Sequence, residues 1–235
     1  MEITVIHGQG HKGSTYHITK AIEEKLAGED TVVHEYFMPK DGPAHCLGCC
    51  QCILHSEELC PQREILAGIE QAILRSQVII IDSPLYCMEM SGQLKTLFDH
   101  FGYLWLTHRP KREMYHKIGI AVSTAAGAGQ AGVTKSIARQ LFWWGVPVVY
   151  RVHFAANASR WEDVSAQIRA KIERKTRVVS SKVLKRAGKA NRNFLGRFLF
   201  GMMRKMQSSN SWNETDRNYW QQQGWLKAAR PWKNG

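Results

Sequence analysis

Long hydrophobic runs are missing from this chain of 235 residues. Its longest apolar stretches, such as the Val-Ile-Ile-Ile run at residues 78–81, are far shorter than the roughly 20 residues that a membrane-spanning helix needs. The first residues have the pattern of a strand and lack the apolar core of a signal peptide. We therefore expect a cytoplasmic protein, neither secreted nor embedded in a membrane.

Several motifs of catalytic and nucleotide sites are also missing. The chain has no G-x-G-x-x-G dinucleotide fingerprint, no G-x-x-x-x-G-K-[ST] P-loop and no H-E-x-x-H zinc motif. Beyond the first loop, its histidines are scattered without an H-x3-H spacing, and no internal repeat or low-complexity segment is visible. The histidines are therefore interpreted as structural.

Negative charge is scarce in the last third of the chain. Residues 1–150 carry 13 Lys and Arg against 15 Asp and Glu, whereas residues 151–235 carry 19 against 5, which together give the net charge of +12. A basic segment of this kind can meet nucleic acid, anionic lipid or an acidic partner. Because apolar and aromatic residues interrupt the basic ones, we expect no nucleic-acid partner. We favour a solvated face, or a surface that attracts anionic nucleotides.

Short β-branched runs alternate with helical patterns over the first two thirds of the chain. Strands are expected at residues 3–7, 31–37, 78–82, 118–123 and 146–154. Helices are expected at residues 15–26, 62–75, 91–103 and 132–144, with a further helix beginning near Arg160. This alternation predicts an α/β fold, a doubly wound parallel sheet of five strands. The flavodoxin-like strand order 2-1-3-4-5 suits it, and ligands then bind beyond the carboxyl ends of the strands.

The pattern changes near residue 175, so we divide the chain into a flavodoxin-like domain at residues 1–175 and a basic helical extension at residues 176–235. One helical face of the extension is apolar: Phe194, Leu195, Phe198, Leu199, Met202, Met203 and Met206. Such a stripe more often packs on its own domain or on a partner subunit than on a membrane surface. The tail beyond it is rich in aromatic residues: Trp212, Tyr219, Trp220, Trp225 and Trp232. These predict that the tail docks onto another surface.

A glycine-rich loop at residues 7–15 joins the first strand to the first helix. Its glycines permit a tight turn, and the free amides at the start of the helix form an anion site. Ser14 and Thr15 add hydroxyl donors, and His11 and Lys12 add positive charge. A terminal phosphate monoester, as in FMN, fits this loop; the alternative is an ordinary turn that binds no ligand.

Two further loops follow the third and fourth strands. Residues 83–91 hold Pro84, which stiffens the exit from the strand, and Ser91, a candidate N-cap. Backbone amides and flat apolar side chains in this loop are suited to an isoalloxazine ring. Residues 123–130 are small, so that the backbone there can approach a planar ligand closely. Each loop is a weak signal by itself, and the three together indicate one ligand site.

Four cysteines crowd into fifteen residues with the spacing C-x2-C-x2-C-x7-C: Cys46, Cys49, Cys52 and Cys60. Thiolates spaced this tightly can converge on one metal centre, and ferredoxin-type clusters open with a similar C-x2-C-x2-C. The alternatives are a four-thiolate zinc site, a redox-active thiol pair and plain buried cysteines. In a cytosolic α/β chain, metal binding or redox chemistry is preferred to disulfides.

The first and second loops carry a family resemblance. The run from His7 to Thr15 stands where the NAD(P)H-dependent FMN reductase family shows H-G-S-P-R-x-G-N-T, and the run from Ser83 to Lys95 is similar to its T-P-x-Y-x-x-x-M-S-x-Q-L-K. The resemblance covers residues 1–155 and points to the iron–sulfur flavoprotein branch of this flavodoxin-like family. One departure matters: the family's Ser-Pro-Arg is Gln9-Gly10-His11 here, which removes a guanidinium and a hydroxyl from the phosphate site.

The resemblance implies that FMN lies across the three loops. Its phosphate is expected on the first loop, with Gln9, His11, Lys12, Gly13, Ser14 and Thr15. Its ring is expected on the second and third loops, with Pro84, Leu85, Tyr86, Cys87, Met88, Ser91, Thr124, Ala125, Gly127 and Gly129. In the iron–sulfur branch the compact cysteine motif, here Cys46, Cys49, Cys52 and Cys60, holds a [4Fe–4S] cluster near the flavin.

The resemblance also implies the activity. We expect FMN to accept hydride from NADH or NADPH and to pass electrons to a quinone, a nitro or azo compound, free flavin, or an iron–sulfur centre with an external carrier. No dedicated catalytic side chain is expected, because the cofactor performs the chemistry. The alternatives are an electron carrier without nicotinamide turnover, and a redox-sensing module whose basic tail binds DNA or anionic lipid. A homo-oligomer is implied, with the face of residues 194–206 as a candidate contact.

Overall fold

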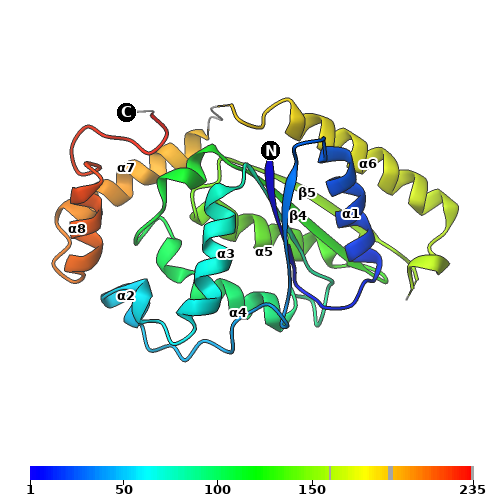
Figure 1. The fold of residues 1–235 in the computed structure, drawn as a ribbon, viewed down its shortest axis with the longest axis horizontal. Helices are drawn as coiled ribbons and strands as arrows, with labels where there is room; N and C mark the ends of the chain where they lie inside the picture. The colour runs from blue at the N-terminus through cyan, green and yellow to red at the C-terminus, as the bar shows by residue number, and fades with distance from the viewer. Residues whose placement is uncertain (159, 190–192, 234–235) are drawn as a thin grey trace.

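A computed structural model of the chain describes residues 1–158, 160–189 and 193–233. Parallel strands form a five-stranded sheet in the order β2-β1-β3-β4-β5, which confirms the predicted topology (Figure 1). The strands are β1 (Glu2–His7), β2 (Val32–Phe37), β3 (Val78–Asp82), β4 (Ile118–Ala125) and β5 (Val148–Ala155). Because the strands are parallel, their carboxyl ends share one edge of the sheet, and the three candidate loops begin there.

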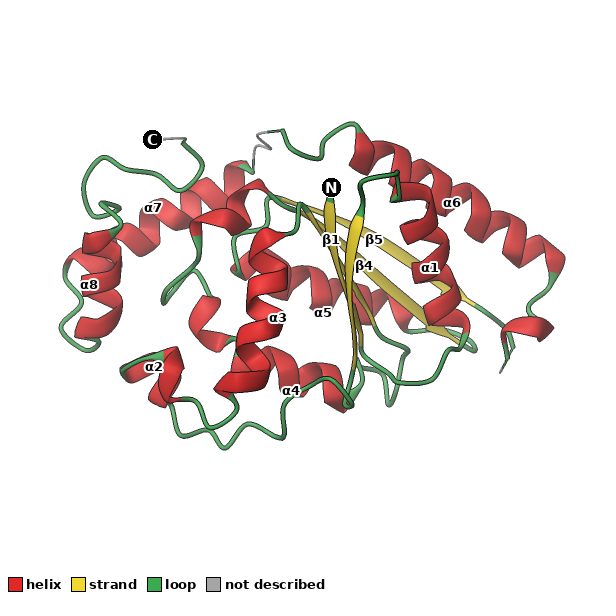
Figure 2. Ribbon diagram, in the orientation of Figure 1, coloured by secondary structure: helices red, strands yellow, loops and turns green. Residues whose placement is uncertain are grey.

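Helices cover both faces of the sheet, as predicted (Figure 2). The first face carries α1 (Ser14–Leu26) and α6 (Ala166–Leu184), and the second carries α3 (Arg63–Arg75), α4 (Gly92–His100) and α5 (Gln130–Trp143). Alternate side chains of β3 divide between the two cores: Val78 and Ile80 enter the first, and Ile79 and Ile81 enter the second. In the described part of the chain, no helix combines the length and the apolar character needed to cross a bilayer.

Two helix boundaries differ from the sequence prediction by three residues or more. α4 ends at His100, three residues early, and Gly102–Leu104 follows as a 3-10 turn. The helix predicted to begin near Arg160 begins at Ala166, because the Ser165 side chain caps its first turn there. Both differences are local, because hydrophobic periodicity predicts that a helix is present more reliably than it predicts the residues at which the helix begins and ends.

The predicted division after residue 175 stays a prediction. α6 runs through this point without a break to Leu184, and its Val179 and Val183 are buried in the first core. The extension continues with α7 (Phe194–Ser208) and α8 (Glu214–Gln222), which lie on the side of the molecule away from α1 in Figure 1.

α7 and α8 close a third core against the loop that joins α4 to β4. Its buried members are Leu106, Tyr115, Phe200, Trp220 and Trp225. The indole of Trp220 donates to His108 O at 2.6 Å, and the Tyr219 hydroxyl donates to Pro110 O at 2.7 Å. The aromatic tail therefore docks onto its own chain, in agreement with the prediction, except that Trp212 is exposed.

Candidate functional site

Three loops meet at the carboxyl-end edge of the sheet. The amide of Gly8 donates to Asp82 O at 2.8 Å, and the Ser91 hydroxyl donates to Gly8 O at 2.5 Å, so that the first and second loops are joined. The amide of Leu85 donates to Thr124 O at 3.0 Å, which joins the second loop to the third. The structure thus brings the three predicted loops together on one continuous surface.

The first loop presents a row of backbone amides without partners. Within the described residues, the amides of residues 11–16 donate to no acceptor, and Gly13 at the N-cap of α1 offers no capping side chain. The Lys12 ammonium lies near this row, 5.3 Å from the centroid of the Tyr16 ring. Free amides at a helix N-terminus, with a lysine and the Ser14 hydroxyl beside them, form a site for a phosphate group. The first loop therefore fits the phosphate of FMN.

Two of the predicted contact residues use their hydroxyls within the protein. Thr15 Oγ1 lies 2.6 Å from Thr124 Oγ1, and the pair is buried, so it ties the first loop to the third. Ser91 Oγ accepts from the amide of Leu94 at 3.3 Å, which caps α4 as predicted, and donates to Gly8 O. These hydroxyls hold the loops in place, whereas the backbone of the first loop remains open to a ligand.

The tip of the second loop is a tight hairpin. Tyr86 and Glu89 exchange two backbone hydrogen bonds of 2.9 Å, and Cys87 and Met88 between them have φ angles of 48° and 67°. This left-handed conformation is unusual for residues other than glycine and asparagine, and costs on the order of 1 kcal/mol for each residue. The turn holds Tyr86 and Met88 at the exposed rim of the site. Gln9 Nε2 donates to the Tyr86 hydroxyl at 2.8 Å and so orients the ring.

Gly129 closes the third loop against the second. It has a φ angle of 103°, and a Cβ there would lie 2.9 Å from Leu85 Cδ2 and 3.0 Å from Met88 Cε. The backbone conformation therefore favours glycine, and a Cβ would also push aside the ends of the Leu85 and Met88 side chains. A Cβ on Gly127 would meet nothing within 4 Å, so this part of the loop faces open space.

The predicted flavin-site residues divide by burial. The exposed ones are His11, Lys12, Tyr86, Cys87, Met88 and Gly127. The half-buried ones are Gln9, Gly13, Ser14, Pro84, Leu85 and Gly129, and the buried ones are Thr15, Ser91, Thr124 and Ala125. The exposed and half-buried sets offer surface to a ligand, and the buried set supports them.

A buried charged network under the first loop was missed by the sequence analysis. His7 Nδ1 lies 2.6 Å from Asp82 Oδ2, and His7 Nε2 lies 2.9 Å from Glu35 Oε1. The imidazole also stacks on Phe37, with 4.5 Å between ring centroids. Burial lowers the pKa of His7, but the Asp82 and Glu35 carboxylates outweigh burial and raise that pKa above its usual value. A protonated His7 therefore ties together β1, β2 and β3 near the candidate phosphate site.

The four predicted metal ligands lie in the segment between β2 and α3, which contains a short helix, α2 (Gln51–Leu54), that the patterns did not predict. Cys46 and Cys49 are exposed, Cys52 and Cys60 are half-buried, and all four are free thiols. Burial raises the pKa of Cys52 to about 11, and the nearby thiols of Cys60, Cys46 and Cys49 add to this increase. The Cys52 thiol therefore lies within electrostatic range of the other three.

Cys60 also has a histidine partner. Its Sγ lies 3.5 Å from His100 Nδ1, and His100 Nε2 lies 2.8 Å from Ala44 O. Because a carbonyl oxygen can only accept, Nε2 carries a proton, and Nδ1 is free to accept from the Cys60 thiol. Within the described ranges, no three His, Cys, Asp or Glu side chains are arranged to hold a metal ion. The chemistry of the thiols fits a metal centre, but their arrangement is not that of a formed one.

Arg109 fixes the backbone of the cysteine segment. Its buried guanidinium donates to Ile53 O at 2.9 Å and to Cys52 O, and it forms an ion pair of 2.7 Å with the buried carboxylate of Asp216 in α8. The sequence analysis assigned no role to either charged residue. Their 107-residue separation leaves no local pattern that could have revealed the pair.

α8 supplies further hydrogen bonds to the same segment. Asn213 Nδ2 donates to Ile53 O at 3.1 Å, and Thr215 Oγ1 donates to Leu54 O at 2.8 Å. The last carbonyls of a helix have no partner within that helix, so these bonds satisfy the end of α2. The C-terminal extension is therefore part of the support of the cysteine segment.

Residues 1–160 match the family model described as NADPH-dependent FMN reductase, which is more than half of the chain. An iron–sulfur flavoprotein from Archaeoglobus fulgidus is 33% identical to the chain over 112 residues. That match covers 47% of this chain and 48% of the relative, so the chain spans about half the length of the curated relative it matches.

Solved structures with the same fold include two from Bacillus anthracis. An azoreductase from strain Sterne superposes with a TM-score of 0.60 at 12% identity, covering 77% of this chain and 99% of that one. An FMN-dependent NADH-azoreductase from strain Ames Ancestor, solved in complex with FMN, superposes with a TM-score of 0.58 at 11% identity, covering 78% and 99%. At this level of identity the likeness establishes the flavodoxin-like fold.

Proposed function

Because the chain belongs to the NADPH-dependent FMN reductase family, we propose that it is an FMN-dependent oxidoreductase that takes reducing equivalents from NADH or NADPH. The acceptor is a quinone, a nitro or azo compound, free flavin, or an iron–sulfur centre in the cysteine segment. The row of unpaired amides at residues 11–16 carries the proposal, since it lies after β1 at the edge where ligands of such sheets bind.

Each part of the site has a role in this proposal. Bound FMN supplies the centre that accepts hydride. The first-loop amides, with Lys12 and Ser14, bind the phosphate in place of the arginine that the family pattern carries. Tyr86 and Met88 offer apolar surface to the ring, and Gly129 lets the second and third loops approach each other. The protein thus contributes binding and orientation, and no catalytic side chain is assigned.

Flavin retention tests the site. In a titration followed by flavin fluorescence, we expect the protein to bind FMN stoichiometrically and Tyr86→Ala to bind it about fivefold to tenfold more weakly, because a lost aromatic contact costs roughly 1 kcal/mol. Tyr86→Phe is the matched control: it keeps the ring and loses only the hydrogen bond from Gln9. Failure of the wild-type protein to take up FMN would overturn the proposed function, and equal affinity of all three proteins would remove Tyr86 from the contact.

Turnover separates the reductase from the electron carrier. With a dye acceptor in excess, we expect steady oxidation of NADH or NADPH, whereas a carrier without nicotinamide chemistry shows none. The rates with the two nucleotides also give the preference between them.

The cysteine segment adds a finer proposal, that Cys46, Cys49, Cys52 and Cys60 hold a [4Fe–4S] cluster. The interacting thiols and the iron–sulfur flavoprotein relative support it. After anaerobic purification we expect about four iron and four sulfide per chain, and loss of both in Cys49→Ser. Cys50→Ser is the control, because Cys50 is an exposed thiol of the same segment outside the motif. If no iron is found and all the cysteines react with a thiol reagent, the alternative of a redox-active thiol pair would be favoured.

Homo-oligomer formation and a cytoplasmic location remain part of the proposal. Light scattering of the purified protein measures the oligomeric state.

A further inference from the structure

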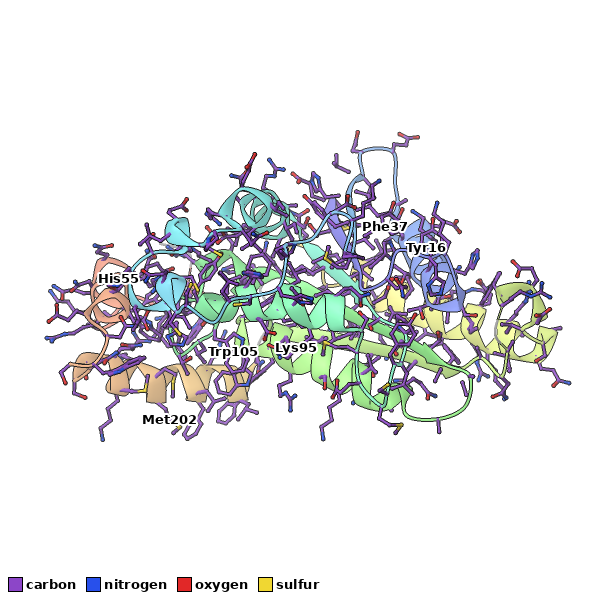
Figure 3. All side chains as sticks on the ribbon, turned by 90° about the horizontal axis from the view of Figure 1, so that it is seen from below. Tyr16, Phe37, His55, Lys95, Trp105 and Met202 are labelled. Carbon is purple, nitrogen blue, oxygen red and sulfur yellow. The ribbon has the colours of Figure 1, made fainter. Side chains whose placement is uncertain are left out.

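α7 (Phe194–Ser208) is apolar on the side that faces away from the protein. Phe200 and Gln207 are its buried residues. Its exposed apolar residues are Phe194 at 88%, Leu195 at 57%, Phe198 at 59%, Met202 at 49% and Met206 at 43% exposure. With about 3.6 residues per turn, these five fall within an arc of roughly 120° opposite the buried face. Figure 3 shows the labelled Met202 at the outer margin of the molecule. A surface helix normally turns a polar face to water, so this face needs another explanation.

Trp212 extends this surface beyond the end of α7. It is 73% exposed and lines one surface hollow together with Met206. We call Phe194, Leu195, Phe198, Met202, Met206 and Trp212 the outer stripe. Phenylalanine, leucine and tryptophan are the residues with which interfacial helices enter the boundary between lipid headgroups and acyl chains.

Cations lie along one side of the outer stripe: around the axis of α7, Arg197 and Arg204 lie roughly 60–80° beyond Phe194, and Lys205 lies within the apolar arc. Within the described residues, Arg204, Lys205 and Arg230 take part in no ion pair, and the Arg197 guanidinium lies over the Trp232 ring at 5.0 Å from its centroid. Arg204 and Arg230 are near neighbours: burial lowers the pKa of Arg230, and the positive charge of Arg204 lowers it further. An anionic partner would reduce the electrostatic repulsion among these like charges.

Negative charge in the extension does not offset these cations. Residues 193–233 contain seven Lys and Arg but only two acidic residues, Glu214 and Asp216. Asp216 is buried in its ion pair with Arg109, which leaves Glu214 as the acidic side chain on this part of the surface. The surface around the outer stripe is therefore strongly cationic.

We propose that α7 lies along the surface of an anionic lipid bilayer, with the outer stripe inserted at the headgroup boundary and Arg204 and Lys205 beside the lipid phosphates. Apolar residues on one arc and cations on its flank are the two features that such binding requires. A second copy of the chain fits less well, because it would bring the same unpaired cations against each other. The exposure of the stripe shows that it does not pack on its own domain, which is one of the two surfaces that the sequence pattern favours.

Vesicle sedimentation with the full-length protein tests the proposal. We expect the protein to pellet with vesicles of phosphatidylcholine and phosphatidylserine, to stay in solution with phosphatidylcholine alone, and to be released by high salt. The assay reads binding directly and does not depend on bound FMN or turnover, so its result is independent of the proposed function.

Two paired variants separate the apolar and the charged contributions. Phe198→Ser with Met202→Ser, and Arg204→Glu with Lys205→Glu, should each reduce partitioning into anionic vesicles by about tenfold or more. Phe198, Met202 and Lys205 are exposed and Arg204 is half-buried, so the fold should be retained, which circular dichroism checks. Ile65→Ser is the matched control, since Ile65 is an exposed apolar residue on α3, and it should bind like the wild type.

Three results would overturn the proposal. The first is no binding of the wild-type protein to anionic vesicles at low salt. The second is binding that the Phe198→Ser, Met202→Ser variant retains in full, which would leave only a non-specific charge effect. The third is a dimer in light scattering that the same variant dissolves without any vesicle binding, which would assign the face to self-association.

Discussion

Replacing Asp216 with alanine is expected to lower the free energy of unfolding by about 3 kcal/mol, because it breaks a buried ion pair and leaves the other charge behind. The Asp216 carboxylate accepts from Arg109 Nη1 at 2.7 Å, from His108 Nδ1 at 2.7 Å and from Asn213 Nδ2 at 3.0 Å. Without it, the buried guanidinium of Arg109 keeps one carboxylate partner, Glu57, at 3.3 Å. Because this contact remains, we expect a loss of unfolding free energy at the lower end of the range that is usual when a buried ion pair is broken.

The same change should loosen the cysteine segment. Arg109 holds the carbonyls of Cys52 and Ile53, so movement of its guanidinium should expose the half-buried Cys52 thiol. Urea unfolding measures the stability, and the rate of alkylation of Cys52, followed by mass spectrometry, measures the loosening. Asp99→Ala is the control, because Asp99 pairs with Lys95 on the surface and should cost no more than about 0.5 kcal/mol. Equal losses of unfolding free energy in the two variants would show that the buried ion pair stabilises the protein no more than the surface pair does.

The sheet could be predicted because its central strands carry an unambiguous signal. A strand buried on both faces is a short run of β-branched residues, and Val78–Asp82 is such a run at the centre of the sheet. α2 could not be predicted in this way. It is a single turn that starts after Cys50 in the left-handed conformation with a φ angle of 55°, and α8 holds its last carbonyls. Four residues are too few to show a helical period.

The meeting of the three loops at one edge of the sheet could be predicted because chain order places them after parallel strands. The direction of individual side chains could not. Thr15 was expected to offer its hydroxyl to the phosphate, but this short side chain bonds to Thr124 within the protein, whereas Ser91 caps α4 as predicted. The contact between His7 and Asp82 depends on the register that pairs these two residues across β1 and β3, and one sequence does not reveal a register.

Replacing His7 with glutamine is expected to remove a pH-dependent part of the stability. The raised pKa of His7 means that the folded protein holds this proton more tightly than the unfolded chain does. The resulting stabilisation is fully present below about pH 6.5, the usual pKa of histidine, and is lost as the pH rises through the raised value. Within this window the contribution of His7 to the free energy of unfolding falls by up to about 1.4 kcal/mol for each pH unit. Glutamine can donate one hydrogen bond to Asp82 or Glu35 but carries no charge.

Urea unfolding of both proteins at about pH 6 and about pH 9 isolates this effect, because the other titrating groups are common to the two chains. At the lower pH we expect the variant to be less stable by roughly 3 kcal/mol, since Asp82 then lacks its buried cationic partner, whereas Glu35 keeps Lys20 at 3.5 Å. The difference should shrink toward the higher pH, and a constant difference would contradict a protonated His7. His34→Gln serves as the control, because its pair with Glu2 is partly exposed and lies away from the loops. Since His7 ends β1 where the first loop begins, His7→Gln should also weaken FMN binding, and the loss should be greatest at the lower pH, where the wild-type histidine is charged.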